Sequence, residues 1–449
     1  RYLDGMFSCV SYGAIRPSLC PTLVRPAYSD LASFKDASMS RIRRINRRTC
    51  SSAVSRLMRV LWTTLVGFPV IFRISGILGG VSILGLWAGW SGDLFAAAER
   101  GNPAARLLPG ELAHERWDLT ARFASGHFLF AEFLITNFGL GDRNAAVIGH
   151  VIRPNGQSRR FRNGRRESRW QLSSDRLRME VGSSLLDQRS PMHQLRVRKK
   201  STRIELDFYP RGPAVWSADF PPSGYALDLL DPAAQAAGSV WVKGMDEPVT
   251  IHGTGAVTHS WANEAESDLV QRRLEFFLFP DEQSEMSLYL ADLTTPHGAR
   301  SSWLVVKKGQ RVVHEAQNFH LRLDGNVKNV GSYYLPQQFS FESAPSHPHI
   351  KGRVELDRLL LLYDPLADIP QPFRFLVSLK LKPRRMWLLS PFEIAFHLDQ
   401  ASAPITLTGT GITKVSFLNP LPSPRPDATV SLFQGFRATG PFKQLPGWS

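Results

Sequence analysis

A histidine and a tryptophan lie two residues apart at the end of the strand-like segment Gly253-Thr-Gly-Ala-Val-Thr-His-Ser-Trp261. An imidazole titrates near neutral pH, so His259 could act as a general acid. The alternative is a structural histidine bonded to a neighbouring loop. The indole of Trp261 offers a large apolar surface and one donor, which suits the plug of a barrel or the wall of a cavity. This segment is therefore the first candidate for a functional site.

Sequence motifs for several other kinds of chemistry are missing. No Gly-x-Ser-x-Gly nucleophile motif occurs. Gly253-Thr-Gly255 lacks a third glycine and does not precede a helix, which argues against a dinucleotide site. Ser346-His-Pro-His349 has no cysteine or acidic cluster nearby and suggests a polar loop more than a metal site. We therefore expect neither a metal nor another cofactor.

The candidate segment occurs twice. Pro248–Trp261 returns as Pro404–Phe417, with six of fourteen positions identical, including the pairs Gly253/Gly409 and Gly255/Gly411. A repeat at domain-length spacing indicates a duplicated domain and not a solenoid, whose units are roughly 20–50 residues long. Chance convergence of two Gly-Thr-Gly strands is the alternative.

The elements that must position these residues are short strands separated by turn signals. The residues of 203–209 alternate strictly between polar and apolar, as in a half-buried strand. Further strands are expected at 127–137, 145–152, 273–279, 286–292, 302–306, 312–316, 320–323, 352–363, 374–381 and 405–413. We predict an all-β chain with two tandem antiparallel barrels after an N-terminal hydrophobic helix. Such a barrel can enclose one apolar ligand or have a filled core.

The charge of the chain is concentrated in two regions. Of the formal net charge of +15, residues 1–59 contribute eleven Lys or Arg against three Asp, and residues 152–203 contribute fifteen against four acids. This uneven distribution weakens the case for a nucleic-acid-binding protein. The three cysteines all precede residue 51, so they predict no disulfide framework in the barrels.

The N-terminal region predicts a membrane segment. A run of arginines up to Arg59 precedes the apolar residues 60–72 and 74–90, which are separated by Arg73. The basic flank predicts a cytoplasmic N-terminus and translocation of the rest. Residues 57–92 are therefore expected to be a membrane anchor or a signal segment. The triplet ending at Ala98 resembles a signal-peptidase site, so cleavage there is the alternative; a buried helical hairpin of a soluble protein is the third possibility.

Residues 158–169 form a dense basic patch with six arginines and one acid. One interpretation is a solvated hairpin, and the other is contact with anionic lipid headgroups by a membrane-tethered barrel. Binding of RNA or DNA would require base-stacking platforms, and we do not expect it.

The repeated motif resembles that of a known superfamily: the paired lipocalin-like barrels of AttH-type proteins, carotenoid 1,2-hydratases (hydroxyneurosporene synthases) and yeast survival-factor proteins. Their first barrel ends in a strand of the form Gly-x-Gly-Tyr-x-Asp-His-x-Trp-Gly. Gly253, Gly255, His259 and Trp261 match this strand, and Gly409-Thr-Gly411 is similar to the closing strand of the second barrel. Residues 117–156 and 208–211 also resemble stretches of the family. The resemblance spans about residues 110–420.

The resemblance implies an apolar ligand and, in the hydratases, protonation of an isoprenoid double bond by an acid with a raised pKa beside aromatic faces. The family's Asp is Thr258 here, so the motif carboxylate is missing. Glu132, Glu275 or Asp292 could replace it, although their places on predicted strands favour solvated, outward-facing residues. With His259, Glu132 and Glu275 as candidate acids, the expected ligand-binding residues are Trp117, Phe130, Trp261, Phe276 and Tyr289.

These observations predict a membrane-tethered or exported lipocalin-like protein that binds or transfers a lipid or isoprenoid. An isoprenoid hydratase- or cyclase-like enzyme and an envelope scaffold are the alternatives. We expect barrels on the periplasmic or extracytoplasmic side of an inner membrane, or secretion to the periplasm after cleavage. The predicted domains are a basic extension (1–56), the membrane segment (57–92), two barrels (110–265 and 266–420) and a Pro-rich tail (421–449).

Overall fold

The computed structural model describes residues 104–418, apart from residues 139–141, 174–175, 190–191, 212–215, 221–223, 281–283, 318, 331–332, 344–348, 370, 372 and 398–402. The predicted extension, the membrane segment with Ala98, and the tail therefore lie outside the described residues. Within the described part of the chain, no helix is long and apolar enough to cross a bilayer.

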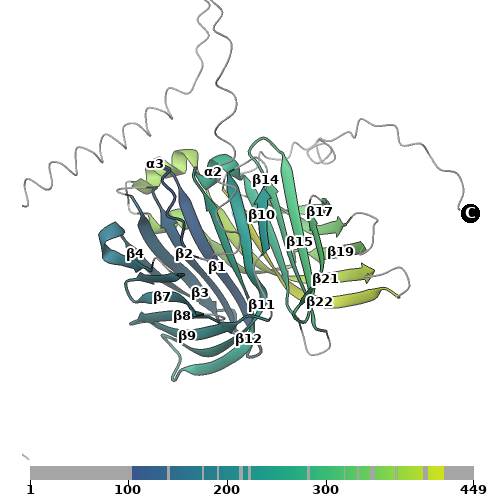
Figure 1. Cartoon of the computed structure of the whole chain (residues 1–449), viewed down its shortest axis with the longest axis horizontal. Coiled ribbons are helices and arrows are strands. Elements are labelled where there is room, and N and C mark those ends of the chain that lie inside the picture. Colours follow the sequence, from purple (N-terminus) through teal and green to yellow (C-terminus); the bar gives the residue numbers. More distant parts are fainter. Residues whose placement is uncertain are drawn as a thin grey trace, which may run out of the picture. The chain divides into compact units, whose positions relative to one another are not determined.

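The first half of the described chain forms one antiparallel sheet of twelve strands (Figure 1). Its strands are β1 (His114–Phe123), β2 (Phe128–Thr136), β3 (Asn144–Ile152), β4 (Ser158–Arg165), β5 (Trp170–Leu172), β6 (Arg178–Val181), β7 (Ser184–Arg189), β8 (Met192–Lys199), β9 (Thr202–Tyr209), β10 (Trp216–Phe220), β11 (Tyr225–Val242) and β12 (Val249–Ala262). A short 3-10 helix, η1 (Glu167–Arg169), precedes β5. The sheet curls until β4 contacts β6, so it is a nearly closed barrel.

The second half forms an antiparallel sheet of ten strands that makes a half-barrel. Its strands are β13 (Arg272–Leu278), β14 (Met286–Thr294), β15 (Arg300–Lys308), β16 (Arg311–Gln317), β17 (His320–Val330), β18 (Tyr333–Glu342), β19 (His349–Glu355), β20 (Arg358–Tyr363), β21 (Arg384–His397) and β22 (Ile405–Phe417). Helix α2 (Glu266–Leu269) connects the sheets, and η2 (Pro365–Asp368) and α3 (Phe373–Lys380) lie between β20 and β21. The prediction of an all-β chain with two tandem antiparallel barrels is confirmed for the described residues, the first barrel being nearly closed and the second a half-barrel. The predicted N-terminal hydrophobic helix lies outside the described residues.

The two repeated Gly-Thr-Gly strands occupy equivalent places. The first sheet has the order β4-β3-β2-β1-β12-β11, and the second has the order β16-β15-β14-β13-β22-β21. In each sheet, four strands form a meander and the last strand of the sheet pairs with the first. Strands β12 and β22 therefore take the same position, as a duplicated domain requires.

Among the described residues, three clusters of buried apolar side chains form the cores of the two sheets and the contact between them. One fills the inside of the first sheet around Trp117, and a second lies within the second sheet around Phe276. The third cluster contains residues of both sheets, among them Phe130, Tyr289 and Trp387. Since the third cluster covers the outer face of β1 and β12, residues on both faces of these strands are buried.

The sequence prediction was wrong for residues 374–381 and oversimplified for residues 352–363. Residues 373–380 form helix α3, although a strand is predicted for residues 374–381. Proline precedes this segment, which favours the start of a helix, and Phe375 and Leu379 are exposed in it, so their apolar character does not mark a buried strand face. Residues 352–363 are divided between β19 and β20, which pair with successive stretches of β21 and are separated by a break at Leu356 and Asp357.

The repeated glycines permit close packing, and this yields a test. A Cβ on Gly253 would lie 2.1 Å from the backbone oxygen of Arg122, whereas one on Gly409 would lie 3.2 Å from the movable ring of Phe392. We expect Gly253→Ala to lower the free energy of unfolding by about 1–3 kcal/mol, because the backbone of β1 must shift. Gly409→Ala should change it by less than about 0.5 kcal/mol. Guanidinium unfolding of both variants would contradict this account if Gly253→Ala were the milder change.

Candidate functional site

Strand β1 supplies polar side chains to two different places because its side chains alternate between its faces. Glu115 and Trp117 point into the first sheet, where Trp117 belongs to the inner apolar cluster. Arg116 and Asp118 point toward the second sheet and contact its side chains. Two buried polar clusters result, one between the sheets and one inside the first sheet.

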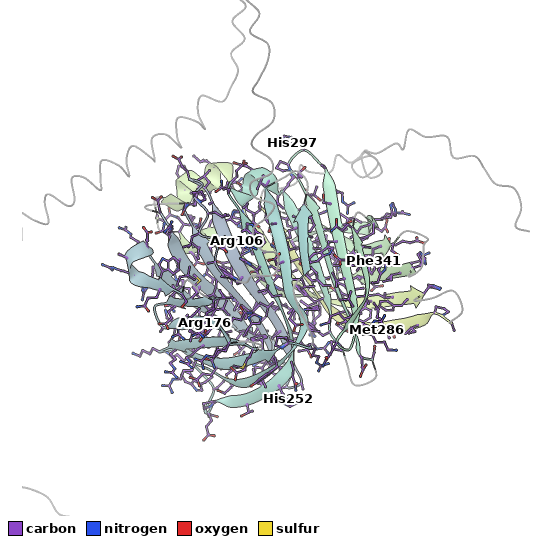
Figure 2. All side chains as sticks on the ribbon, in the orientation of Figure 1. Arg106, Arg176, His252, Met286, His297 and Phe341 are labelled. Carbon is purple, nitrogen blue, oxygen red and sulfur yellow. The ribbon has the colours of Figure 1, made fainter. Side chains whose placement is uncertain are left out.

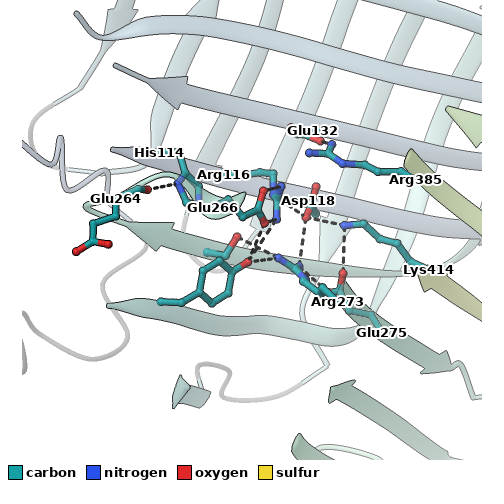
Figure 3. Close-up of polar contacts among 12 residues, drawn as sticks. His114, Arg116, Asp118, Glu132, Glu264, Glu266, Arg273, Glu275, Arg385 and Lys414 are labelled. Atoms are coloured by element: carbon teal, nitrogen blue, oxygen red, sulfur yellow. Dashed lines mark hydrogen bonds and ion pairs between the residues drawn. The ribbon is translucent and has the colours of Figure 1, made fainter. Parts of the chain in front are cut away.

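The inter-sheet cluster consists of Arg116, Asp118, Arg273, Glu275 and Lys414 (Figure 3). One carboxylate oxygen of Asp118 lies 2.7 Å from Lys414 Nζ, 3.2 Å from Arg116 Nε and 3.4 Å from Arg273 Nη2. Glu275 accepts from Arg273 at 2.7 Å and lies 3.2 Å from Lys414. All five residues are less than a tenth exposed. The cluster therefore joins β1 to β13 and β22 through desolvated charges.

Phenols and a further carboxylate extend this cluster. Tyr289 donates to Glu275 at 2.9 Å, and Arg273 donates to the hydroxyl of Tyr225 at 2.6 Å. Arg116 forms an ion pair with Glu266 at 2.7 Å. These bonds give the buried ions the partners that burial requires.

The carboxylates of the inter-sheet cluster are held in the ionised form. Burial alone would raise the pKa of Asp118, but Lys414, Arg116 and Arg273 together lower it well below its usual range. Burial likewise opposes the effect of Arg273 and Lys414 on Glu275, and the net result is a lowered pKa. For Glu266, Arg116 and His114 outweigh burial and lower the pKa to about 2. Such groups act as bases or as partners of cations, not as proton donors at neutral pH.

A pocket opens beside the cluster, between β1, β2 and β3 of one sheet and β20, β21 and β22 of the other. Its lining residues are Asp118, Leu119, Thr120, Phe130, Ala131, Glu132, Ile148, Gly149, His150, Tyr363, Arg385, Trp387 and Lys414. Phe130 and Trp387 stack with ring centroids 5.0 Å apart, and Glu132 accepts from Arg385. The pocket is narrow, with a volume of about 10 Å³, which is room for about one water molecule. It combines aromatic walls with paired charges.

One edge of the pocket leads to the basic patch of residues 158–169. Tyr363 donates to Asp368, and this carboxylate also pairs with Arg160 at 2.7 Å and Arg162 at 2.6 Å. Burial, assisted by Arg160 and opposed by Asp368, lowers the pKa of His150 to about 4. Two of the six arginines of the patch therefore share one carboxylate of the second sheet.

The first-sheet cluster consists of Glu115, Trp117, Asp228, His259 and Trp261. His259 Nε2 lies 2.8 Å from Glu115 Oε1, and Nδ1 lies 3.9 Å from Asp228 Oδ2. The imidazole is stacked on Trp117, with centroids 4.5 Å apart and planes at 7°, and it is tilted against Trp261 at 4.8 Å. Its partner is thus a carboxylate of β1, not a neighbouring loop.

The structure distributes the predicted site residues over three places. Trp117, His259 and Trp261 meet inside the first sheet, whereas Phe130, Glu132, Glu275 and Tyr289 lie between the sheets. Phe276 packs in the core of the second sheet, away from both clusters. Gly253, Gly255, Gly409 and Gly411 lie on β12 and β22, where three of them meet neighbouring atoms at less than 3 Å from an added Cβ.

The prediction that Glu132, Glu275 and Asp292 face solvent was wrong. Their exposures are 7%, 0% and 1%. Glu132 and Glu275 are covered by the facing sheet, and Asp292 is paired with Arg272 at 3.0 Å and Arg300 at 2.9 Å. The alternation of residues along a strand cannot reveal that a second sheet covers the face expected to be in solvent.

Sequence reasoning missed Glu115, Asp118, Asp228 and Lys414. Asp118 lies directly opposite Thr258 in the register of β1 and β12. Asp118 thus brings a carboxylate to the same face of the sheet as Thr258, from the neighbouring strand. Lys414 occupies the position in β22 that Thr258 occupies in β12. The repeat in the sequence, combined with the pairing of β1 with β12, is therefore the pattern from which Asp118 and Lys414 could have been found.

Within the described residues, no group of three or more His, Cys, Asp and Glu side chains could hold a metal ion. His349 of the Ser346–His349 motif pairs with Glu342 at 3.2 Å.

Neither a protein-family model nor a curated protein matches the chain. Among solved structures, it is similar to an AttH protein of Nitrosomonas europaea, with 10% identity over 69% of this chain and 94% of the other and a TM-score of 0.48. CghA with Sch210972 (11% identity, 72% and 95% coverage, TM-score 0.48) and kievitone hydratase of Nectria haematococca (10%, 69% and 90%, 0.44) are also similar.

The inter-sheet cluster predicts a strong effect of Asp118→Asn. The variant leaves Lys414, Arg116 and Arg273 with one carboxylate fewer in a buried site, so we expect the free energy of unfolding to fall by about 3–5 kcal/mol. The exposed Glu205→Gln, which disrupts the surface pair with Arg198, should cost less than about 1 kcal/mol.

The same variant should change the acid sensitivity of the fold. Carboxyl groups with a lowered folded pKa stabilise the protein above their unfolded pKa and cease to do so as the pH falls through the folded value. Wild-type stability should therefore decline between pH 4.5, the ordinary pKa of a glutamate, and about pH 2, the pKa of folded Glu266. Urea unfolding across this range should show a shallower decline for Asp118→Asn. An equal slope would contradict the role given to Asp118.

Proposed function

We propose that the chain binds an apolar small molecule of the lipid or isoprenoid class at the inter-sheet pocket, with an oxygen-bearing end of that molecule near Lys414 and Arg385. The observation that carries the proposal is the lining of this pocket. Two cationic side chains of the second sheet meet the aromatic walls Phe130 and Trp387 in one place. Ligand sites commonly combine an apolar surface with a few convergent polar groups.

Lys414 is suited to hold a carboxylate oxygen. Burial lowers the pKa of Lys414, while Asp118 and Glu275 oppose this effect, so its charge depends on the oxygen atoms around it. A ligand oxygen would add a further acceptor to a group that can donate three hydrogen bonds. The narrow pocket means that Phe130 and Trp387 must part when a larger molecule enters, and binding thus selects a more open arrangement.

Acid–base catalysis is the second candidate function, and the position of Glu132 favours it. This carboxylate lies in the same pocket, paired with Arg385 beside the stacked aromatic rings. The lowered pKa values of Asp118 and Glu275 argue against protonation of an isolated double bond by these groups. A carboxylate base with Lys414 and Arg385 as donors instead suits proton removal beside a carbonyl. Candidate ligands can be incubated with the full chain and then analysed by mass spectrometry. Catalysis would convert them to an altered product, whereas binding alone would leave them unchanged.

Membrane tethering through residues 57–92 is part of the proposal, with the two sheets on the extracytoplasmic side. It is supported by the arginine run before the apolar segments. We expect the full chain to stay with membranes in alkaline carbonate, and deletion of residues 57–92 to release it. Release of the intact chain, at its full mass, would contradict an anchor.

The pocket predicts that Lys414 discriminates between an acid and its ester. In the full chain, Lys414→Met should weaken binding of the fluorescent fatty acid parinaric acid by about tenfold or more, because a charge-assisted hydrogen bond is lost. Binding of its methyl ester should change little. The fold should persist, since Asp118 retains Arg116 and Arg273 as partners.

Lys307→Met is the matched control, because Lys307 is a buried lysine of the second sheet that does not line the pocket. It should leave both affinities unchanged. Equal loss of acid and ester binding in Lys414→Met, or no loss of either, would count against a polar anchor at this residue.

A further inference from the structure

The segment just before β1 lies against the first-sheet cluster. We call residues 104–110 the strap. The backbone N–H groups of Arg106 and Leu107 donate to the carboxylate of Glu115 at 2.9–3.2 Å. Farther along, Gly110 N donates to Asn263 Oδ1 at 2.7 Å, and Asn137 Nδ2 donates to the oxygen of Leu108 at 3.1 Å. The strap is thus held by hydrogen bonds at Arg106, Leu107, Leu108 and Gly110.

The side chain of Arg106 inserts between an indole and a carboxylate. Its guanidinium carbon lies 3.6 Å from the ring centroid of Trp261, and Nη2 lies 3.4 Å from Asp228 Oδ2. A guanidinium over the face of a tryptophan is a favourable cation–π contact, and it is strengthened where water is excluded. Figure 2 labels Arg106 beside the first sheet. The contact has the chemistry of a bound cation rather than of a surface ion pair.

Hydrogen-bonding capacity remains beneath the strap. His259 Nδ1 is buried and has no hydrogen-bond partner within the described part of the chain, and the nearest carboxylate oxygen, Asp228 Oδ2, is 3.9 Å away. The other ring nitrogen, Nε2, donates to Glu115, which leaves Nδ1 as an acceptor. Buried polar atoms in proteins are nearly always paired, so this unpaired acceptor marks a place where the N–H group of a ligand can bind.

We propose that Glu115, Asp228, His259 and Trp261 form a binding site for an organic cation, a molecule with a guanidinium or ammonium group, and that Arg106 occupies this site as an internal ligand. When the strap opens and Arg106 leaves the site, a cation from solution can bind there. The site lies on the opposite face of β1 from the inter-sheet pocket, so it does not depend on the function proposed for that pocket. Leu107 has φ of +49°, a left-handed conformation that opening would relieve.

Chemical rescue tests the proposal in the full chain. Arg106→Ala should lower the midpoint of thermal unfolding, and methylguanidinium in the low millimolar range should restore it along a saturating curve. Binding to the folded state alone raises stability in this way. Sodium chloride at equal ionic strength should not restore it. Arg122→Ala is the matched control, because the guanidinium of Arg122 is exposed and donates to the backbone oxygen of Thr410.

A saturating rescue confined to Arg106→Ala supports the cation site. Equal rescue of both variants, rescue by sodium chloride, or no rescue of Arg106→Ala would overturn it. If Arg106→Ala does not fold, hydrogen exchange of the wild-type chain tests the proposal instead. Methylguanidinium should speed exchange of the amides of Arg106 and Leu107 as it displaces the strap, and unchanged exchange at saturating concentration would overturn the proposal.

Discussion

The arrangement of the two sheets depends on the buried charges between them. Asp118 of the first sheet contacts three cations, and two of these, Arg273 and Lys414, belong to the second sheet. A buried ion without a partner costs several kcal/mol, so the sheets can meet only where these charges pair. Apolar packing alone, as in the shared cluster around Tyr289 and Trp387, would tolerate small shifts of one sheet against the other. The ion pairs thus fix the geometry of the pocket beside them.

The same charges determine which chemistry the pocket can support. Ionised carboxylates held by arginine and lysine are poor proton donors, so an isoprenoid hydratase that relies on a carboxylic acid does not fit Asp118 or Glu275. Cationic donors next to Phe130 and Trp387 do fit an apolar molecule with one oxygen-bearing end. The alternation of β1 places a second polar cluster, around His259, on its other face. One strand therefore contributes side chains to two separate polar clusters.

The sequence predicted the all-β class and the equivalence of the two Gly-Thr-Gly strands. It also predicted Glu132 as a candidate, but with the wrong environment. The partners of these residues could not be predicted, because Glu115 and Asp118 become neighbours of His259 and Lys414 only through strand register and the packing of one sheet on the other. Helix α3 was missed because its run of apolar residues is typical of a strand and because none of its described side chains is buried.

Native mass spectrometry of the full chain, purified in mild detergent from the cells that make it and followed by lipid extraction, tests the central claim most directly. An apolar molecule between the sheets should appear as one bound mass per chain. That molecule should carry a carboxylate, as an anchor at Lys414 and Arg385 requires. A chain that carries no such molecule and also takes up no parinaric acid would contradict a ligand site between the sheets and would leave the buried charges with a structural role alone.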